Sequence, residues 1–94
     1  GNNIIAFMQS SGYIRLEENT TATSKNLYQA YCRWCEDNTE KPMSAKSFSG
    51  YLKENEKKYH IHYSTNIPSD NGKNARGFQG IHTQIRIDNY RWCR

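Results

Sequence analysis

The sequence SAKSFSGYLKENEKKYHIHYSTNIPSDNGKNARGFQGIHTQIRI, residues 44–87, decides the fold because the spacing of its apolar residues changes partway along. The first part has the spacing of one helix face: Phe48, Tyr51 and Leu52. Ser44 is a good N-cap residue, so this part predicts a helix over residues 44–56. The second part alternates apolar and polar residues over 59–64 and again over 81–87, which predicts two strands.

Turn-forming residues separate the two predicted strands. The segment 66–77, NIPSDNGKNARG, is rich in Asn, Gly, Ser and Pro, and its Asn71-Gly72 pair is the strongest hairpin signal in the chain. We therefore expect the strands to form a hairpin, the wing, with residues 66–77 as its loop.

The upstream part of the chain contains the clearest helical pattern. Residues 25–37 place their apolar side chains on one stripe: Leu27, Ala30, Tyr31, Trp34 and Cys35. Thr23 or Ser24 supplies the N-cap. The turn 39–42 ends the helix, because Pro42 has no N–H and restricts the residue before it.

The first residues add another helix and a short strand. We expect the helix over 3–10, the strand over 13–16 and a polar loop over 17–24. The resulting order is helix, strand, helix, turn, helix, strand, wing, strand. This order predicts one α+β domain over residues 1–94, a winged helix with a three-helix core and a small antiparallel sheet. The following residues are expected to form most of the core: Leu27, Tyr31, Trp34, Phe48, Leu52, Ile61, Ile81 and Ile85.

Positive charge is concentrated in the second half of the chain. Residues 1–40 hold three Lys or Arg and five Asp or Glu, whereas residues 41–94 hold ten Lys or Arg and four Asp or Glu. A basic surface of this kind is expected where a domain binds a polyanion, and the alternative is a solvated basic face without a partner.

The chain contains few signals for secretion or membranes. Its three cysteines are an odd number and too few for a secreted disulfide framework, which favours a reducing, cytoplasmic setting. The longest apolar run, residues 4–8, is far shorter than the roughly 20 residues of a membrane span, so we expect no membrane partner. The chain begins with Gly1, and we interpret it as a domain cut from a longer protein.

The helix 44–56 and the wing together predict a surface for double-stranded DNA. The start of a recognition helix faces base edges in the major groove, while cations on a wing contact phosphates. Small residues permit close approach, and glycines let the backbone lie near a phosphate. The candidate DNA-binding residues are Lys41, Ser44, Lys46, Ser47, Ser49, Gly50, Lys53, Lys73, Asn74, Arg76 and Gly77.

The sequence offers two alternatives to DNA binding. One is a zinc-stabilised domain, since Cys32 and Cys35 form a C-x-x-C pair and the candidate partners are His60, His62 and His82. Because Cys35 lies on the apolar stripe, core packing is the favoured interpretation and no metal or cofactor is expected. The other is a protein-interaction winged helix, with these candidate contacts: Tyr28, Tyr51, and Tyr90 to Trp92.

No spacing in the chain nominates a nucleophile with a base or a pair of catalytic carboxylates. Its acids form short clusters such as Glu17-Glu18 and Glu36-Asp37, which are typical of solvated helix ends and surfaces. We therefore expect no catalytic site in these residues.

Three motifs in order resemble the C-terminal domain of the phage and plasmid primase-helicases. The motifs are LYQAYCRWC at 27–35, KPMSAKSF at 41–48 and GKNARGFQGI at 72–81. That family includes the replication protein of a satellite bacteriophage and is related to poxvirus-type helicases. The resemblance covers about residues 24–82.

This resemblance implies a winged helix detached from a larger replication protein. In the satellite-phage member the domain binds the replication origin, so the resemblance implies origin DNA as ligand and the subunits of a hexameric helicase as further partners. It places the DNA contacts on helix 44–56 and on residues 72–77. The ATP-binding loop and primase carboxylates of that family have no counterpart in this sequence.

Overall fold

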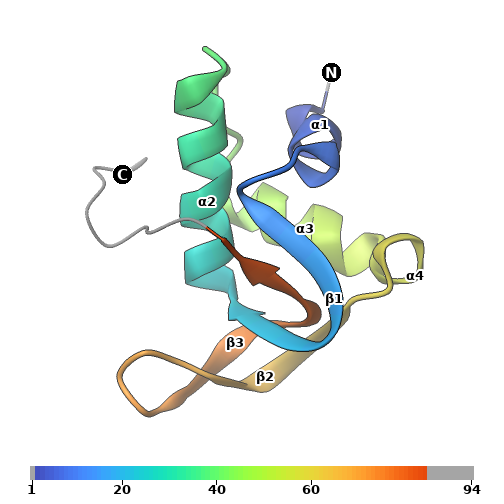
Figure 1. The fold of residues 1–94 in the computed structure, drawn as a ribbon, viewed down its shortest axis with the longest axis vertical. Helices are drawn as coiled ribbons and strands as arrows, with labels where there is room; N and C mark the ends of the chain where they lie inside the picture. The colour runs from blue at the N-terminus through green and yellow to red at the C-terminus, as the bar shows by residue number, and fades with distance from the viewer. Residues whose placement is uncertain (1, 85–94) are drawn as a thin grey trace.

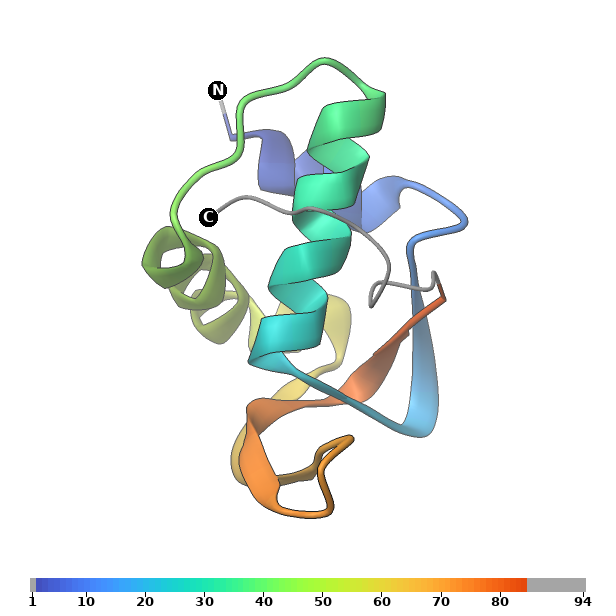
Figure 2. The same ribbon diagram turned by 90° about the vertical axis from the view of Figure 1, so that its left-hand side faces the viewer.

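A computed structural model describes residues 2–84, which form an α+β fold of helices packed on one three-stranded antiparallel sheet (Figure 1). The elements follow in the order α1 (Asn3–Gln9), β1 (Ile14–Thr23), α2 (Ser24–Asp37), α3 (Ala45–Glu54), α4 (Glu56–Tyr59), β2 (His62–Pro68) and β3 (Asn74–Thr83). The strand order is β1-β3-β2, with β3 paired antiparallel to both neighbours. The β2–β3 hairpin lies beyond the N-terminal end of α2 (Figures 1 and 2).

The two longest helices begin at the capping residues expected from the sequence. The Thr23 hydroxyl accepts a hydrogen bond from the Asn26 N–H at 3.1 Å at the start of α2. The Ser44 hydroxyl accepts one from the Ser47 N–H, also at 3.1 Å, at the start of α3. Each hydroxyl satisfies an N–H group that has no partner within its helix.

Aromatic rings from three helices form the centre of the core. The rings of Tyr31 and Phe48 stack with centroids 4.8 Å apart, and Phe7 of α1 packs against both. The predicted core residues within the described part of the chain are all buried: Leu27, Tyr31, Trp34, Phe48, Leu52, Ile61 and Ile81. Ile85 lies outside the described residues.

The prediction of a loop over 17–24 after a short strand over 13–16 is wrong. β1 continues to Thr23 and pairs with β3 on both sides of a register shift between Leu16 and Thr21. Asn19, with φ of 64°, lies within that irregularity. Most side chains of β1 are exposed, so this edge strand carries no apolar alternation to reveal it.

The helix predicted over 44–56 and the strand predicted over 59–64 have different boundaries. α3 ends at Glu54, and the short α4 contains Tyr59. His60 then adopts a left-handed conformation with φ of 57°, and β2 begins only at His62. Tyr59 and Ile61 are nevertheless both buried, which explains why the sequence looked like an alternating strand.

The predicted loop over 66–77 is also too long. β2 reaches Pro68, which pairs with Asn74 at the start of β3, so the turn is limited to residues 69–73. Gly72 has a positive φ of 80° within it, as the Asn-Gly signal predicted. The returning strand therefore starts well before residue 81, and the rest of the predicted 81–87 strand lies outside the described residues from 85 onward.

Both thiols of the C-x-x-C pair are buried within α2. Cys32 is 2% exposed and Cys35 is 1% exposed, and Cys35 belongs to the apolar core. Within residues 2–84, no group of three or more His, Cys, Asp or Glu side chains is arranged to hold a metal ion. No helix in the same part of the chain has the length and apolar character needed to cross a membrane.

Candidate nucleic-acid interface

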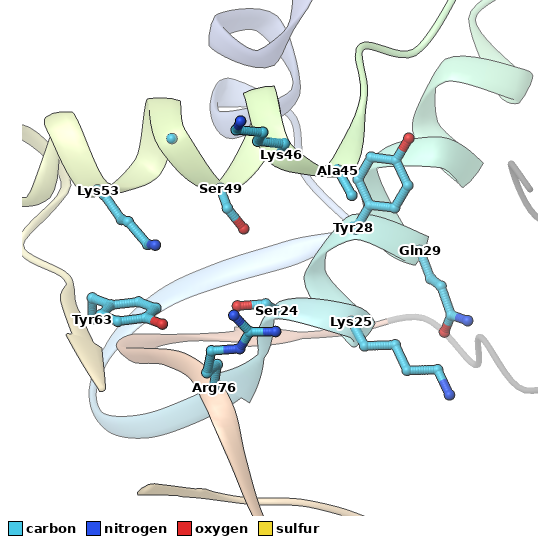
Figure 3. A pocket seen from close by; sticks show the side chains of 11 residues that line it. Ser24, Lys25, Tyr28, Gln29, Ala45, Lys46, Ser49, Lys53, Tyr63 and Arg76 are labelled. Carbon is cyan, nitrogen blue, oxygen red and sulfur yellow. The ribbon is translucent and has the colours of Figure 1, made fainter. Parts of the chain in front are cut away.

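A groove of about 740 Å³ separates α3 from the start of α2 and the β2–β3 hairpin (Figure 3). Four elements contribute to its lining: Ser24, Lys25, Tyr28 and Gln29 from α2; Ala45, Lys46, Ser49, Gly50 and Lys53 from α3; Tyr63 from β2; and Arg76 from β3. We call this the basic groove, because it holds four cations and its lining includes no carboxylate.

The cations of the basic groove are available to a ligand. The four cations are Lys25, Lys46, Lys53 and Arg76. Each is exposed, and within residues 2–84 none of them forms an ion pair with Asp or Glu. Like charges in a concave site reinforce one another and focus a positive potential toward solvent. The groove is therefore suited electrostatically to an anion.

The side chain of Lys53 has a defined position above an aromatic ring. Its Nζ lies 4.2 Å from the centroid of Tyr63, a cation–π contact. Tyr63 is itself fixed, because its N–H donates to Glu56 Oε2 at 2.6 Å and its ring packs edge-on against buried Phe78. The arrangement holds a lysine ammonium at the wall of the groove.

Two tyrosines of α2 fix the backbone at the entrance to α3. The Tyr28 hydroxyl donates to the Met43 carbonyl at 2.8 Å, and the Tyr31 hydroxyl accepts from the Met43 N–H at 2.8 Å. Tyr31 also donates to Asn3 Oδ1 at 2.5 Å. Burial raises the pKa of Tyr31 to about 12, so this hydroxyl keeps its proton at neutral pH.

The basic groove brings together part of the predicted DNA-binding set. Five predicted residues line it: Lys46, Ser49, Gly50, Lys53 and Arg76. Figure 3 shows Ser49 and Lys53 directed from α3 toward the sheet, while Arg76 rises from β3 toward α3. Arg76 thus belongs to a strand opposite α3 and not to a loop at the tip of the wing.

The other predicted residues lie outside the groove. Ser44 and Ser47 are exposed at the start of α3, but the Ser44 hydroxyl already serves as the helix cap and contacts the Ser47 hydroxyl at 3.1 Å. Lys41 is exposed in the segment before α3, and its carbonyl accepts from Asn3 Nδ2 at 2.9 Å.

The last two predicted residues outside the groove, Lys73 and Asn74, lie at the tip of the hairpin. Lys73 is in the turn, with its N–H bonded to Asn71 Oδ1 at 2.9 Å, and Asn74 is the first residue of β3. A second, smaller cavity of about 260 Å³ is lined by both the start of α2 and the turn, including Asn26 and Asp70. The tip therefore lies beside α2, and its charge is mixed.

Gly77 does not belong to an exposed surface. It is buried in β3, where it pairs with Thr23 of β1 and Ser64 of β2. A Cβ at this position would lie 2.2 Å from the Ala22 carbonyl oxygen. The glycine is needed for close packing of the strands, and its burial leaves it no exposed surface for a DNA contact.

Six residues that line the basic groove were not among the predicted DNA contacts, and two of them, Lys25 and Tyr63, contribute a charge and a ring to it. Lys25 follows the N-cap of α2 and lies far in sequence from the basic half of the chain, which is why charge distribution did not identify it. Tyr63 is one of the apolar residues of the alternating pattern over 59–64, which favours a buried position, yet it is only half-buried and lines the groove. The position of Lys25 in the first turn of a predicted helix was its one available signal.

Comparisons of the chain with family models, with curated proteins and with solved structures find no match. The fold and the groove define this protein as a small α+β domain with a basic groove between its third helix and a β-hairpin. The resemblance of the sequence motifs to primase-helicases remains a prediction.

Proposed function

We propose that this domain binds double-stranded DNA and that its fold is a winged helix with α3 as the recognition helix. The observation that carries the proposal is the basic groove, in which Lys25, Lys46, Lys53 and Arg76 meet without a carboxylate. The winged-helix assignment is supported by the element order and by the strand order β1-β3-β2. DNA affinity depends strongly on such cations, because binding them to phosphates releases condensed counterions.

The exposed face of α3 is suited to a DNA major groove. Its core-facing side is occupied by buried Phe48 and Leu52, which leaves the opposite side to solvent. That side carries Lys46 and the small residues Ser49 and Gly50, so the helix backbone can approach base edges closely. Sequence preference would come from this face, and affinity from the surrounding cations.

The sequence motifs suggest which DNA the domain would meet. If the resemblance to primase-helicases holds, the domain directs a replication enzyme to its origin and assembles beside a hexameric helicase. The domain itself then has a binding role without chemistry of its own. Its site of action would be the cytoplasm of a bacterial host.

A salt titration of the 94-residue chain tests the proposal. Binding to a fluorescent duplex of random sequence is measured by anisotropy at about 50 mM and about 200 mM salt. We expect affinity to fall steeply with salt, and Lys53→Ala and Arg76→Ala to weaken binding. Lys57→Ala is the matched control, because Lys57 is exposed on α4 and does not line the groove.

Two results would contradict this function. Absence of duplex binding at low salt would favour a protein-interaction domain. Equal effects of Lys57→Ala and the two groove variants would mean that any DNA binding reflects overall charge and not the groove.

A further inference from the structure

One end of the basic groove gathers hydrogen-bond donors from three separate elements. Lys53 belongs to α3, Tyr63 to β2 and Arg76 to β3, and all three line the same cavity. In Figure 3, Lys53 descends from α3 above Tyr63, and the Tyr63 hydroxyl faces Arg76. The fold therefore brings together an ammonium, a phenol and a guanidinium that are distant in the sequence.

These three groups are not used by the fold for polar contacts of their own. Within residues 2–84, neither the Tyr63 hydroxyl nor the Arg76 guanidinium has a hydrogen-bond partner, and the Lys53 ammonium, which lies over the Tyr63 ring, has no hydrogen bond or ion pair. An ammonium and a guanidinium donate but do not accept hydrogen bonds. A ligand here must supply negative charge and several acceptor oxygens.

A phosphate oxygen fits this chemistry better than a base edge. A guanine edge also presents only acceptors in the major groove, N7 and O6, but it carries no net charge to balance the two cations. A backbone phosphate carries one negative charge and presents only acceptors. Arginine and lysine are the residues that most often contact it.

The position of Lys53 is prepared before the ligand arrives. Its ammonium lies over the Tyr63 ring at 4.2 Å, and the ring is supported by Phe78. A side chain that is already ordered loses less conformational entropy on binding than a mobile surface lysine. The hydroxyl of the same ring can add a neutral hydrogen bond to the phosphate.

We infer that one phosphate of the DNA backbone binds between Lys53, Tyr63 and Arg76, so that α3 and the hairpin hold the same phosphate. This inference rests on the proposed function, and it specifies a contact that the function alone does not require. It makes Tyr63 a DNA-binding residue and gives Arg76 a shared role with Lys53.

The number of phosphates can be counted from salt dependence. Each neutralised phosphate contributes about 0.9 to the slope of log affinity against log salt. If Lys53 and Arg76 share one phosphate, the double variant Lys53→Ala/Arg76→Ala lowers the slope by about one unit, and each single variant by less. If they bind separate phosphates, the double variant lowers it by about two units.

Two further variants test the loss of charge and the role of the Tyr63 hydroxyl separately. Lys57→Ala/Arg76→Ala should behave as Arg76→Ala alone, because Lys57 is outside the groove. Tyr63→Phe retains the ring beneath Lys53 but removes the hydroxyl, so we expect several-fold weaker binding with an unchanged slope. Thermal unfolding of each variant establishes that the fold is retained.

The outcomes separate this inference from the proposed function. A fall of about two units in the double variant, with additive losses of affinity, overturns the shared phosphate while leaving DNA binding intact. Wild-type affinity in Tyr63→Phe overturns the role of that hydroxyl. A wild-type chain that binds no duplex overturns both proposals.

Discussion

The Tyr31 hydroxyl accepts a hydrogen bond from the Met43 N–H across 2.8 Å, and this contact joins the core of the domain to the segment that enters α3. Tyr31 is fully buried, so the start of α3 is fixed by a group inside the core. The neighbouring Tyr28 holds the carbonyl of the same residue. The position of one wall of the basic groove therefore depends on a residue that does not line it.

The first prediction concerns this contact. Tyr31→Phe should lower the free energy of unfolding by about 1–3 kcal/mol, because it leaves the Met43 N–H without its partner in a part-buried site. Tyr28→Phe should cost less than about 1 kcal/mol, since water can replace its exposed hydrogen bond. Urea unfolding measures both. Equal costs would mean that burial does not distinguish the two hydroxyls.

The second prediction concerns alkaline pH. Burial raises the pKa of Tyr31 to about 12 from 10.0, so the folded chain holds this proton more tightly than the unfolded chain. Burial also raises the pKa of Tyr59, with its hydrogen bond to Tyr51 as the next cause. The stability from Tyr31 is complete below pH 10 and is lost as the pH rises toward 12.

Urea unfolding at a series of pH values checks this alkaline loss. The decline above pH 10 should be shallower in Tyr31→Phe, which has no proton to lose at this position. A variant that declines as steeply as the wild type would show that Tyr31 does not contribute.

The third prediction compares two glycines. Gly77→Ala would place a Cβ 2.2 Å from a backbone oxygen of β1, so we expect a loss of about 3 kcal/mol or more. Gly50→Ala has nothing within 4 Å and lies inside α3, so helix propensity should stabilise the domain by about 0.5–1 kcal/mol. Thermal unfolding gives both values. A stable Gly77→Ala variant would contradict the close packing of β1 on β3.

The helical part of the fold was predictable because its signals are local. The apolar stripe of α2, the caps Thr23 and Ser44, and the Asn71-Gly72 turn each depend on neighbouring residues, and each is where the sequence placed it. Helix periodicity and turn chemistry are visible within a few positions of the chain.

The strand boundaries and part of the site were not predictable, because they depend on tertiary pairing. β1 is an exposed edge strand that continues through Thr20 and Thr21 only because β3 lies beside it. Lys25 and Arg76 line one groove although they are far apart in sequence. The spacing of apolar residues is also ambiguous at Tyr59 and Ile61. Both are buried, as alternate residues of a strand would be, but Tyr59 belongs to the short helix α4.

The central claim is that duplex DNA contacts α3 and the cations of the basic groove, and mapping of amide chemical shifts on the ¹⁵N-labelled chain tests it most directly. On addition of duplex DNA, we expect the largest changes at groove residues: Lys25, Ser49, Gly50, Lys53 and Arg76. The acidic residues at the C-terminal end of α2 and just after it serve as the internal control and should not change: Glu36, Asp37 and Glu40. Changes centred on that acidic end, or no changes with saturating duplex, would contradict the account.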